Sequence, residues 1–156
     1  MTDKQTDLIG LTQNEIVESL ISNNLITEKE KFRAKQLWHW IYHRGVRDFA
    51  AMSSLGRPLR EKLAAAYSLD LPGVAVEQIS MDGTRKWLLK SDDGNEVEAV
   101  FIPEEDRGAL CVSSQVGCTL ACTFCHTGTQ KLVRNLTAAE IVGQVMLARD
   151  SCGEWP

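Results

Sequence analysis

The chain has 156 residues, 44% of them apolar and 24% charged, and a formal net charge of −4; this allows one globular domain, or one small domain and part of another. No apolar run reaches the roughly eighteen residues of a membrane-spanning helix, and the first ten residues lack the basic start and apolar run of a secretory signal. We therefore exclude a membrane protein and expect a cytoplasmic one.

The first seventy residues carry the pattern of short helices. Thr12 and Glu15 form a capping box ahead of an apolar stripe, which predicts a first helix. A second helix is predicted over residues 31–44 and a third over residues 57–67. The side chains expected to face inward from the second helix are Phe32, Leu37, Trp38 and Ile41. Three short helices with brief connections predict a compact helical module over residues 1–70.

Charge is distributed unevenly along the chain. Residues 29–62 contain nine basic residues and three acids, so this segment carries +6 and the remainder carries −10. A local basic excess indicates a polyanionic partner, because phosphate contacts depend on nearby charge and not on the total. A solvated helical surface would show the same composition, and the sequence leaves both interpretations open.

The pattern changes to strands after residue 71. The predicted strands cover residues 74–79, 86–90, 96–102 and 109–114, with a hairpin turn at 82–83. A loop with several cysteines follows, and Thr137 and Glu140 then form a second capping box that opens a helix through Ala148. Strand, cysteine loop and helix in this order are typical of the first β–α step of a barrel-like α/β domain.

Four of the five cysteines fall within fifteen residues. They are Cys111, Cys118, Cys122 and Cys125, and Cys152 stands apart. Thiols stay reduced in the cytoplasm, so clustered cysteines favour metal binding or catalysis over a disulfide framework. Cys118, Cys122 and Cys125 follow the spacing C-x-x-x-C-x-x-C, which places three thiols on one loop.

This spacing fits a cubane iron–sulfur cluster. Such a cluster has four irons that each take one outside ligand, and cysteine thiolate is the usual donor. Three cysteines leave one iron open to chelate the amino and carboxylate groups of S-adenosylmethionine and to pass it an electron; reductive cleavage then gives a deoxyadenosyl radical. Phe124, before the last cysteine, suits a position near the bound adenine. A structural zinc site is the alternative, for which only Cys111 and His126 lie near enough in the sequence to supply a fourth ligand.

Several linked segments closely resemble the dual-specificity RNA methyltransferases of the RlmN family, which are radical S-adenosylmethionine (SAM) enzymes. The segments that carry the resemblance are 32–38, 98–103, 111–118 (CVSSQVGC), Cys122, Cys125, 134–136 and 140–145. Their order along nearly the whole chain is far more specific than the cysteine spacing alone. The resemblance identifies Cys118, Cys122 and Cys125 as ligands of a [4Fe-4S] cluster.

The resemblance also implies the reaction. Family members methylate carbon 2 of an adenine in 23S rRNA and in tRNA, through a methyl-cysteine intermediate, with S-adenosyl-L-methionine as cofactor. It implies a disulfide bond, a monomer and an external electron donor such as a flavodoxin. Cys111 matches the cysteine that resolves the covalent adduct, and Glu98 matches the acid assigned as general base. Without the resemblance, Glu98 is a solvent-facing strand residue and Cys111 a small hydrophobe in an apolar strand.

The aromatic and histidine residues of the second helix are weaker candidates. His39 and His43 lie at i and i+4, but no third metal ligand is placed near them, so we expect surface or RNA-facing histidines. Trp38, Trp40 and Tyr42 have rings able to stack on unpaired bases. Core packing by Trp38, with the other two partly exposed, is the simpler interpretation.

We therefore expect an α/β protein in two parts. Residues 1–70 form a helical RNA-binding accessory module, and residues 71–156 begin a radical SAM domain, with the first strand–loop–helix of an incomplete, TIM-like barrel. By resemblance, the glycine-rich SAM site and the methyl-carrying cysteine lie beyond this chain, and Cys152 does not match that cysteine. The chain is then an inactive portion of the enzyme. A non-catalytic RNA-binding module and a zinc-stabilised interaction domain remain as alternatives.

Overall fold

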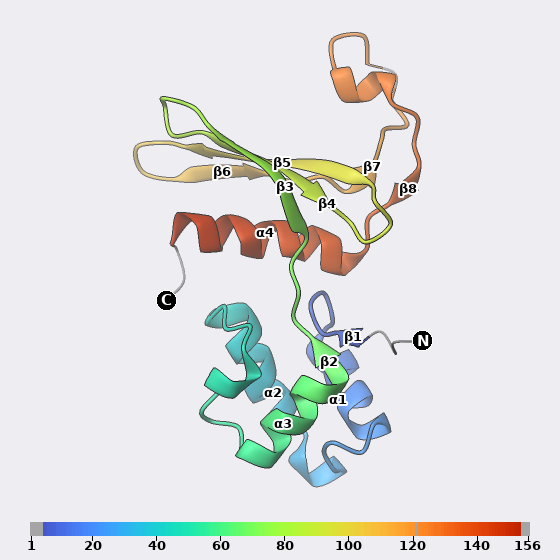
Figure 1. Ribbon diagram of the computed structural model, residues 1–156, viewed down its shortest axis with the longest axis vertical. Helices are drawn as coiled ribbons and strands as arrows, with labels where there is room; N and C mark the ends of the chain where they lie inside the picture. The colour runs from blue at the N-terminus through green and yellow to red at the C-terminus, as the bar shows by residue number, and fades with distance from the viewer. Residues whose placement is uncertain (1–4, 121, 154–156) are drawn as a thin grey trace. The chain divides into compact units, whose positions relative to one another are not determined.

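The computed structural model describes residues 5–120 and 122–153, which form two compact units (Figure 1). Unit 1 contains the residues up to Asp70 and those from Arg149, and unit 2 contains Leu71–Ala148. Each unit has its own hydrophobic core. No helix in the described ranges is long and apolar enough to cross a membrane.

Unit 1 is helical and contains one short parallel strand pair. Its elements are β1 (Thr6–Asp7), α1 (Gln13–Ser22), η1 (Glu28–Glu30), α2 (Phe32–Trp38), η2 (His39–His43), η3 (Phe49–Ala51), α3 (Arg57–Ala66) and β2 (Tyr67–Ser68). The predicted capping box of α1 is confirmed, because the Thr12 hydroxyl accepts a bond from the backbone N–H of Glu15 and the Glu15 carboxylate accepts one from the N–H of Thr12. The β1–β2 pair was not predicted, because strands of two residues carry no periodic pattern.

The second predicted helix is present as α2 continued by a π-helical turn, η2. Leu37 and Ile41 are buried as predicted. Phe32 is 52% exposed, so its predicted inward position is wrong. It lies three residues before Lys35 and seven before His39, on the exposed side of the helix, whereas Leu37 and Ile41 are four residues apart on the buried side.

The third predicted helix, α3, ends one residue earlier than predicted, because Tyr67 leaves the helix and enters β2. The buried Tyr67 hydroxyl lies 2.8 Å from Ser19 Oγ and 2.8 Å from Asn23 Nδ2, which ties the end of α3 to α1. The largest fully buried side chains of unit 1 are Leu8, Ile16, Leu20, Leu37, Ile41, Met52, Leu55, Leu63 and Tyr67.

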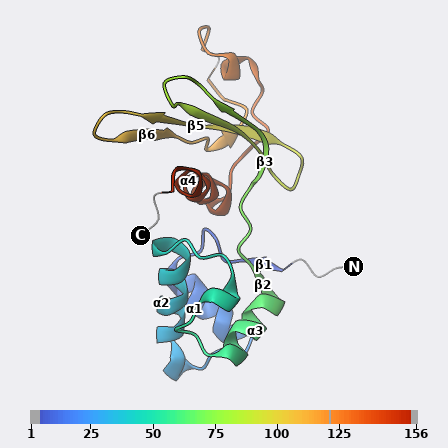
Figure 2. The same cartoon turned by 60° about the vertical axis from the view of Figure 1, so that its left-hand side comes forward.

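Unit 2 consists of a four-stranded antiparallel sheet and a long helix (Figures 1 and 2). Its elements are β3 (Gly73–Ile79), β4 (Arg85–Lys90), β5 (Glu96–Pro103), β6 (Gly108–Cys111), β7 (Gln115–Val116), η4 (His126–Thr129), β8 (Arg134–Asn135) and α4 (Ala138–Cys152). The four predicted strands are confirmed in the order β3-β4-β5-β6. The last of them ends at Cys111, three residues before its predicted end.

Side chains along the central strands alternate between the two sides of the sheet, so one face of the sheet is buried and the other is open. Trp87 and Leu89 of β4 face the same side as Val97 and Ala99 of β5, and this cluster also contains Leu147 and Ala148. Figures 1 and 2 both show α4 lying along that face of the sheet. The chain is therefore a mixed α/β protein, and β6, the cysteine loop and α4 follow the predicted order of strand, loop and helix. The short strands β7 and β8 at the two ends of the loop were not predicted.

Candidate iron–sulfur loop and catalytic sheet face

The cysteine loop is closed at its base by backbone hydrogen bonds. β7 and β8 pair with Val116 opposite Arg134, and the backbone N–H of Val133 donates to the carbonyl of Val116 at 2.8 Å. One step further, the N–H of Cys118 donates to the carbonyl of Gln130 at 3.3 Å. The three predicted ligands therefore lie on a loop whose two ends are held side by side.

Two glycines allow the backbone to approach itself within this loop. Gly117 has φ +76°, and a Cβ there would lie 2.8 Å from the carbonyl carbon of Lys131. A Cβ on Gly128 would lie 2.7 Å from the carbonyl oxygen of Cys122. Both contacts are with backbone atoms, which cannot move aside as the end of a flexible side chain can. Both positions therefore require glycine.

Backbone amides stabilise two of the three sulfur atoms of the loop, those of Cys118 and Cys125. The N–H of Leu120 donates to Cys118 Sγ at 3.3 Å. The backbone amides of Gly128 and Thr127 lower the pKa of the exposed Cys125 thiol, because they stabilise its thiolate. Thiolate donors with N–H···S bonds are the chemistry that iron–sulfur clusters use, so the residues of this loop fit such a group.

The structure places the three cysteines on one loop but does not assemble them into a metal geometry. Within residues 5–120 and 122–153, no three His, Cys, Asp or Glu side chains are grouped closely enough to hold a metal ion. Cys118 and Cys122 are partly buried and Cys125 is exposed. All three are free thiols, as is Cys111, so the implied disulfide bond is not formed among these four residues.

Glu98 and Cys111, the two predicted catalytic residues, share the open face of the sheet. Cys111 of β6 lies opposite Val100 of β5, and Glu98 is two residues before Val100 on the same strand. Side chains two apart on a strand point to the same side, so both residues face away from the Trp87 cluster. Cys111 is exposed, which differs from the buried small hydrophobe that its apolar strand suggested.

Lys86 is a partner of Glu98 that sequence reasoning missed. Its Nζ lies 2.5 Å from Glu98 Oε1, and both side chains are roughly half exposed. The pair is diagonal, because Lys86 is opposite Val100 and Glu98 is opposite Leu88 across β4 and β5. The sequence predicted both strands but not their register, and it is the register that brings these two opposite charges together on one face.

Gln144 of α4 is a second residue that sequence reasoning missed. It is fully buried, and its side-chain amide bonds to both backbone groups of Ser113. The Ser113 hydroxyl in turn donates to the carbonyl of Glu98 at 2.7 Å. Ser113 therefore connects α4, the strand that carries Glu98 and the segment that runs from Cys111 to the cysteine loop. A glutamine on the inward side of an apolar helix was the signal available in the sequence.

Arg134 holds the start of α4 against the β4–β5 turn. Its guanidinium makes two bonds to the Glu140 carboxylate, at 2.8 and 2.7 Å, and a third to Asp93 at 2.6 Å. Arg134 lowers the pKa of Glu140 to about 2 and lowers that of Asp93 well below its usual range. Glu140 also accepts a bond from the N–H of Thr137, so the second predicted capping-box contact is confirmed.

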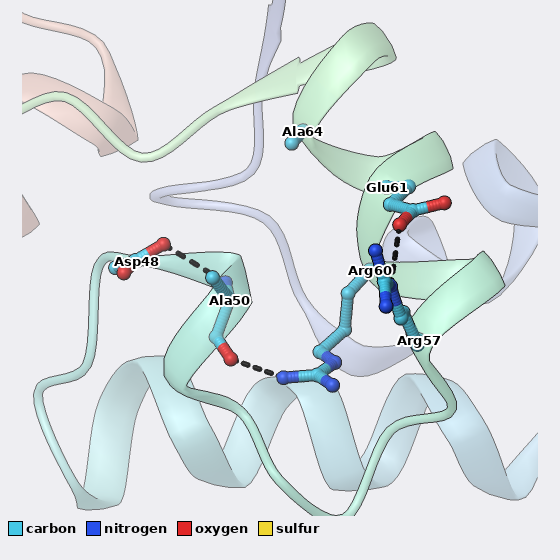
Figure 3. Close-up of a pocket in the computed structure, with 6 residues that line it drawn as sticks. All are labelled: Asp48, Ala50, Arg57, Arg60, Glu61 and Ala64. Atoms are coloured by element: carbon cyan, nitrogen blue, oxygen red, sulfur yellow. Dashed lines mark hydrogen bonds and ion pairs between the residues drawn. The ribbon is translucent and has the colours of Figure 1, made fainter.

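Unit 1 contains a hollow of about 470 Å³, shown in Figure 3. It is lined by Asp48, Ala50, Arg57, Arg60, Glu61 and Ala64. Most of its polar groups are engaged locally: Arg57 pairs with Glu61 at 2.8 Å, Arg60 donates to the carbonyl of Ala50, and Asp48 accepts from the N–H of Ala50. Most charged groups that line the hollow therefore already have a partner within the protein, which leaves few of them to bind a ligand.

Comparison with known proteins decides the family. Residues 6–69 match the family model described as ribosomal RNA large subunit methyltransferase N-terminal domain. The chain is 64% identical over 150 residues to the dual-specificity RNA methyltransferase RlmN of Rhodospirillum rubrum, and 59% identical over 154 residues to that of Rhizorhabdus wittichii. These alignments cover 96% and 99% of this chain.

The chain belongs to the RlmN family. The resemblance found in the sequence is thereby confirmed. The chain spans 34% and 38% of the lengths of these two RlmN relatives. The crystal structure of a radical SAM methyltransferase from Sphaerobacter thermophilus is similar to it with a TM-score of 0.82 and 38% identity, over 96% of this chain and 43% of that one.

Proposed function

We propose that this chain is part of a radical SAM enzyme that methylates carbon 2 of adenine in 23S rRNA and tRNA. The closed loop with three cysteine thiols carries the proposal, since its donors suit an iron–sulfur cluster with one open iron. Cys118, Cys122 and Cys125 would hold this [4Fe-4S] cluster. When bound, the cluster supplies the electron that cleaves S-adenosylmethionine, and an external donor such as a flavodoxin replenishes it.

Glu98 and Cys111 are proposed as the catalytic residues within this chain. Glu98 is the proton acceptor, and the Lys86 ammonium 2.5 Å away orients its carboxylate. Cys111 is the thiol that resolves the covalent adduct between protein and RNA. Their position on one open sheet face supports both roles, because an RNA base can approach them from the same side.

The wider architecture is part of the same proposal. Residues 1–70 are the RNA-binding accessory module, and residues 71–156 are the first part of a radical SAM domain with a TIM-like barrel. The extended similarity to a solved radical SAM methyltransferase supports this assignment. We propose that the protein acts as a monomer in the cytoplasm.

Anaerobic reconstitution with iron and sulfide tests the central claim. We expect about four irons per chain and a cubane-type electron paramagnetic resonance signal after reduction. Cys122→Ala should lose both, and Cys152→Ala, outside the loop, should keep both. A colourless, folded protein with one zinc per chain would instead establish the zinc-stabilised interaction domain.

A further inference from the structure

α2 and η2 together expose one continuous stripe of basic and aromatic side chains. Their opposite side is buried through Leu37 and Ile41. The six exposed residues, here named the α2–η2 stripe, are Lys31, Phe32, Lys35, His39, His43 and Arg44. Spacings of three and four residues place Phe32, Lys35, His39 and His43 on one side of the helix, and Lys31 and Arg44 flank its two ends. The stripe is thus a single surface.

The stripe has a strong local positive charge. Residues 31–44 contain four basic residues, two histidines and no acid. Glu28 offsets one of these charges through an ion pair with Lys31 at 2.5 Å, and Arg33, Lys35 and Arg44 still give the helix a net positive charge. Four of the nine basic residues of segment 29–62 therefore lie on this one helical segment, where phosphate groups can reach them.

Flat groups stack on one another along the same helix. The guanidinium of Arg33 lies 4.7 Å from the centre of the Phe32 ring, and that of Arg44 lies 4.8 Å from the Trp40 ring. The rings of His39 and His43 meet edge to face at 4.5 Å. These groups form flat faces at the surface, and Arg guanidinium planes and aromatic rings are the faces on which unpaired bases stack.

Hydrogen bonds to Ser54 fix two of these stacks in place. The indole N–H of Trp40 donates to Ser54 Oγ at 2.7 Å, and Arg33 donates to the Ser54 carbonyl at 3.3 Å. Tyr42 was also a candidate for base stacking in the sequence. Its hydroxyl accepts a hydrogen bond from the backbone N–H of Gly10 at 2.7 Å. Tyr42 therefore anchors the helix, and Phe32 and Arg44 present the stacking faces.

We propose that the α2–η2 stripe binds an unpaired, single-stranded segment of RNA. Lys31 and Lys35 contact phosphates, while bases stack on Phe32 and on the Arg44 guanidinium over Trp40. An acidic peptide would use the charges but not the stacked faces, and a duplex hides the faces of its bases. The identity of the partner as RNA rests on the proposed function, whereas the binding surface rests on the contacts described above.

The salt dependence of binding separates the two kinds of contact. The probe is a fluorescently labelled, unstructured RNA of about sixteen nucleotides, measured by anisotropy from low to high salt. Lys31→Gln/Lys35→Gln should reduce the slope of log K against log salt by about 1.4, because each lost single-strand phosphate contact removes about 0.7. Phe32→Ala should weaken binding about fivefold with an unchanged slope, because stacking releases no counterions.

A matched control removes the same charge from another element. Arg57→Gln/Lys62→Gln on α3 should change the slope by less than half as much as the stripe variant. The proposal is overturned if this control loses as much affinity, if the duplex of the same RNA binds at least as tightly as the single strand, or if the native chain binds neither. Iron reconstitution of the same samples keeps the two proposals distinct, because a chain that takes up four irons without binding RNA refutes only the stripe.

Discussion

The side-chain amide of Gln144 hydrogen-bonds both backbone groups of Ser113, accepting from its N–H at 2.8 Å and donating to its carbonyl at 2.9 Å. A third bond joins Gln144 Nε2 to the carbonyl of Glu140 within α4. The amide thus takes the place of a neighbouring strand for Ser113, which lies two residues after the end of β6 at Cys111. One buried side chain of α4 thereby fixes the segment between the proposed catalytic thiol and the proposed cluster loop.

Gln144→Met tests this connection. Methionine has nearly the same shape but bonds neither backbone group of Ser113, so we expect unit 2 to lose about 2–4 kcal/mol of stability. Hydrogen exchange of the Ser113 amide should accelerate at least about tenfold. Val145→Ala, at a partly exposed neighbouring position, should change stability by less than about 0.5 kcal/mol. A Gln144→Met protein as stable as the Val145→Ala control would show that water replaces the amide without loss.

Gly128→Ala tests the closed geometry of the cysteine loop. The added Cβ would lie 2.7 Å from the carbonyl oxygen of Cys122, so the loop must open to accept it. We expect iron uptake on reconstitution to fall by at least about half, with the far-ultraviolet circular dichroism unchanged. Gly73→Ala is the control, because its Cβ would meet only the Lys90 carbonyl at an ordinary 3.9 Å. Full iron uptake by Gly128→Ala would mean that this contact is not needed for the cluster.

Most elements could be predicted because their signals are local. The capping pairs at Thr12 and Thr137 and the two-residue alternation around Trp87 follow from neighbouring residues alone. The exposed position of Phe32 was not predicted, because an apolar residue at the first position of a helix can lie on either side of it. Phe32 lies on the same side of the helix as the exposed residues Lys35 and His39, and it is exposed with them.

The arrangement of the candidate site depended on contacts distant in the sequence. The cysteine spacing and the family resemblance singled out Glu98 and Cys111 as separate residues, but only the strand register shows that they share a sheet face. Ser113 and Gln144 are 31 residues apart, and neither has a local pattern that predicts their contact. Such pairs are set by the packing of α4 on the sheet, which sequence periodicity does not encode.

Glu140 and Arg134 predict a loss of stability in acid. Arg134 lowers the pKa of Glu140 from 4.5 to about 2, so the folded state favours the carboxylate. A group with a lowered folded pKa contributes stability above its unfolded pKa, near 4.5, and this contribution is lost as the pH falls toward 2. Glu140→Gln should therefore lower the free energy of unfolding by roughly 2 kcal/mol at pH 7 and flatten its decline below pH 4.5.

Glu61→Gln is the control for this pH effect. Its ion pair with Arg57 joins two largely exposed side chains on α3, which solvent screens. We expect a change of less than about 0.5 kcal/mol at pH 7 and the native acid profile, in urea titrations between pH 2 and 7. An acid profile of Glu140→Gln that matches the native one would assign the acid sensitivity to other carboxylates.

Alkylation of the cysteines tests whether Cys111 stands outside the cluster. In the metal-free chain, Cys125 should react with iodoacetamide faster than Cys118, because backbone amides lower its thiol pKa and it is more exposed. In the reconstituted chain, Cys118, Cys122 and Cys125 should be protected while Cys111 still reacts, as peptide mass spectrometry can show. Protection of all four would make Cys111 a fourth ligand, which would remove the open iron on which the radical mechanism depends and favour a four-cysteine metal site.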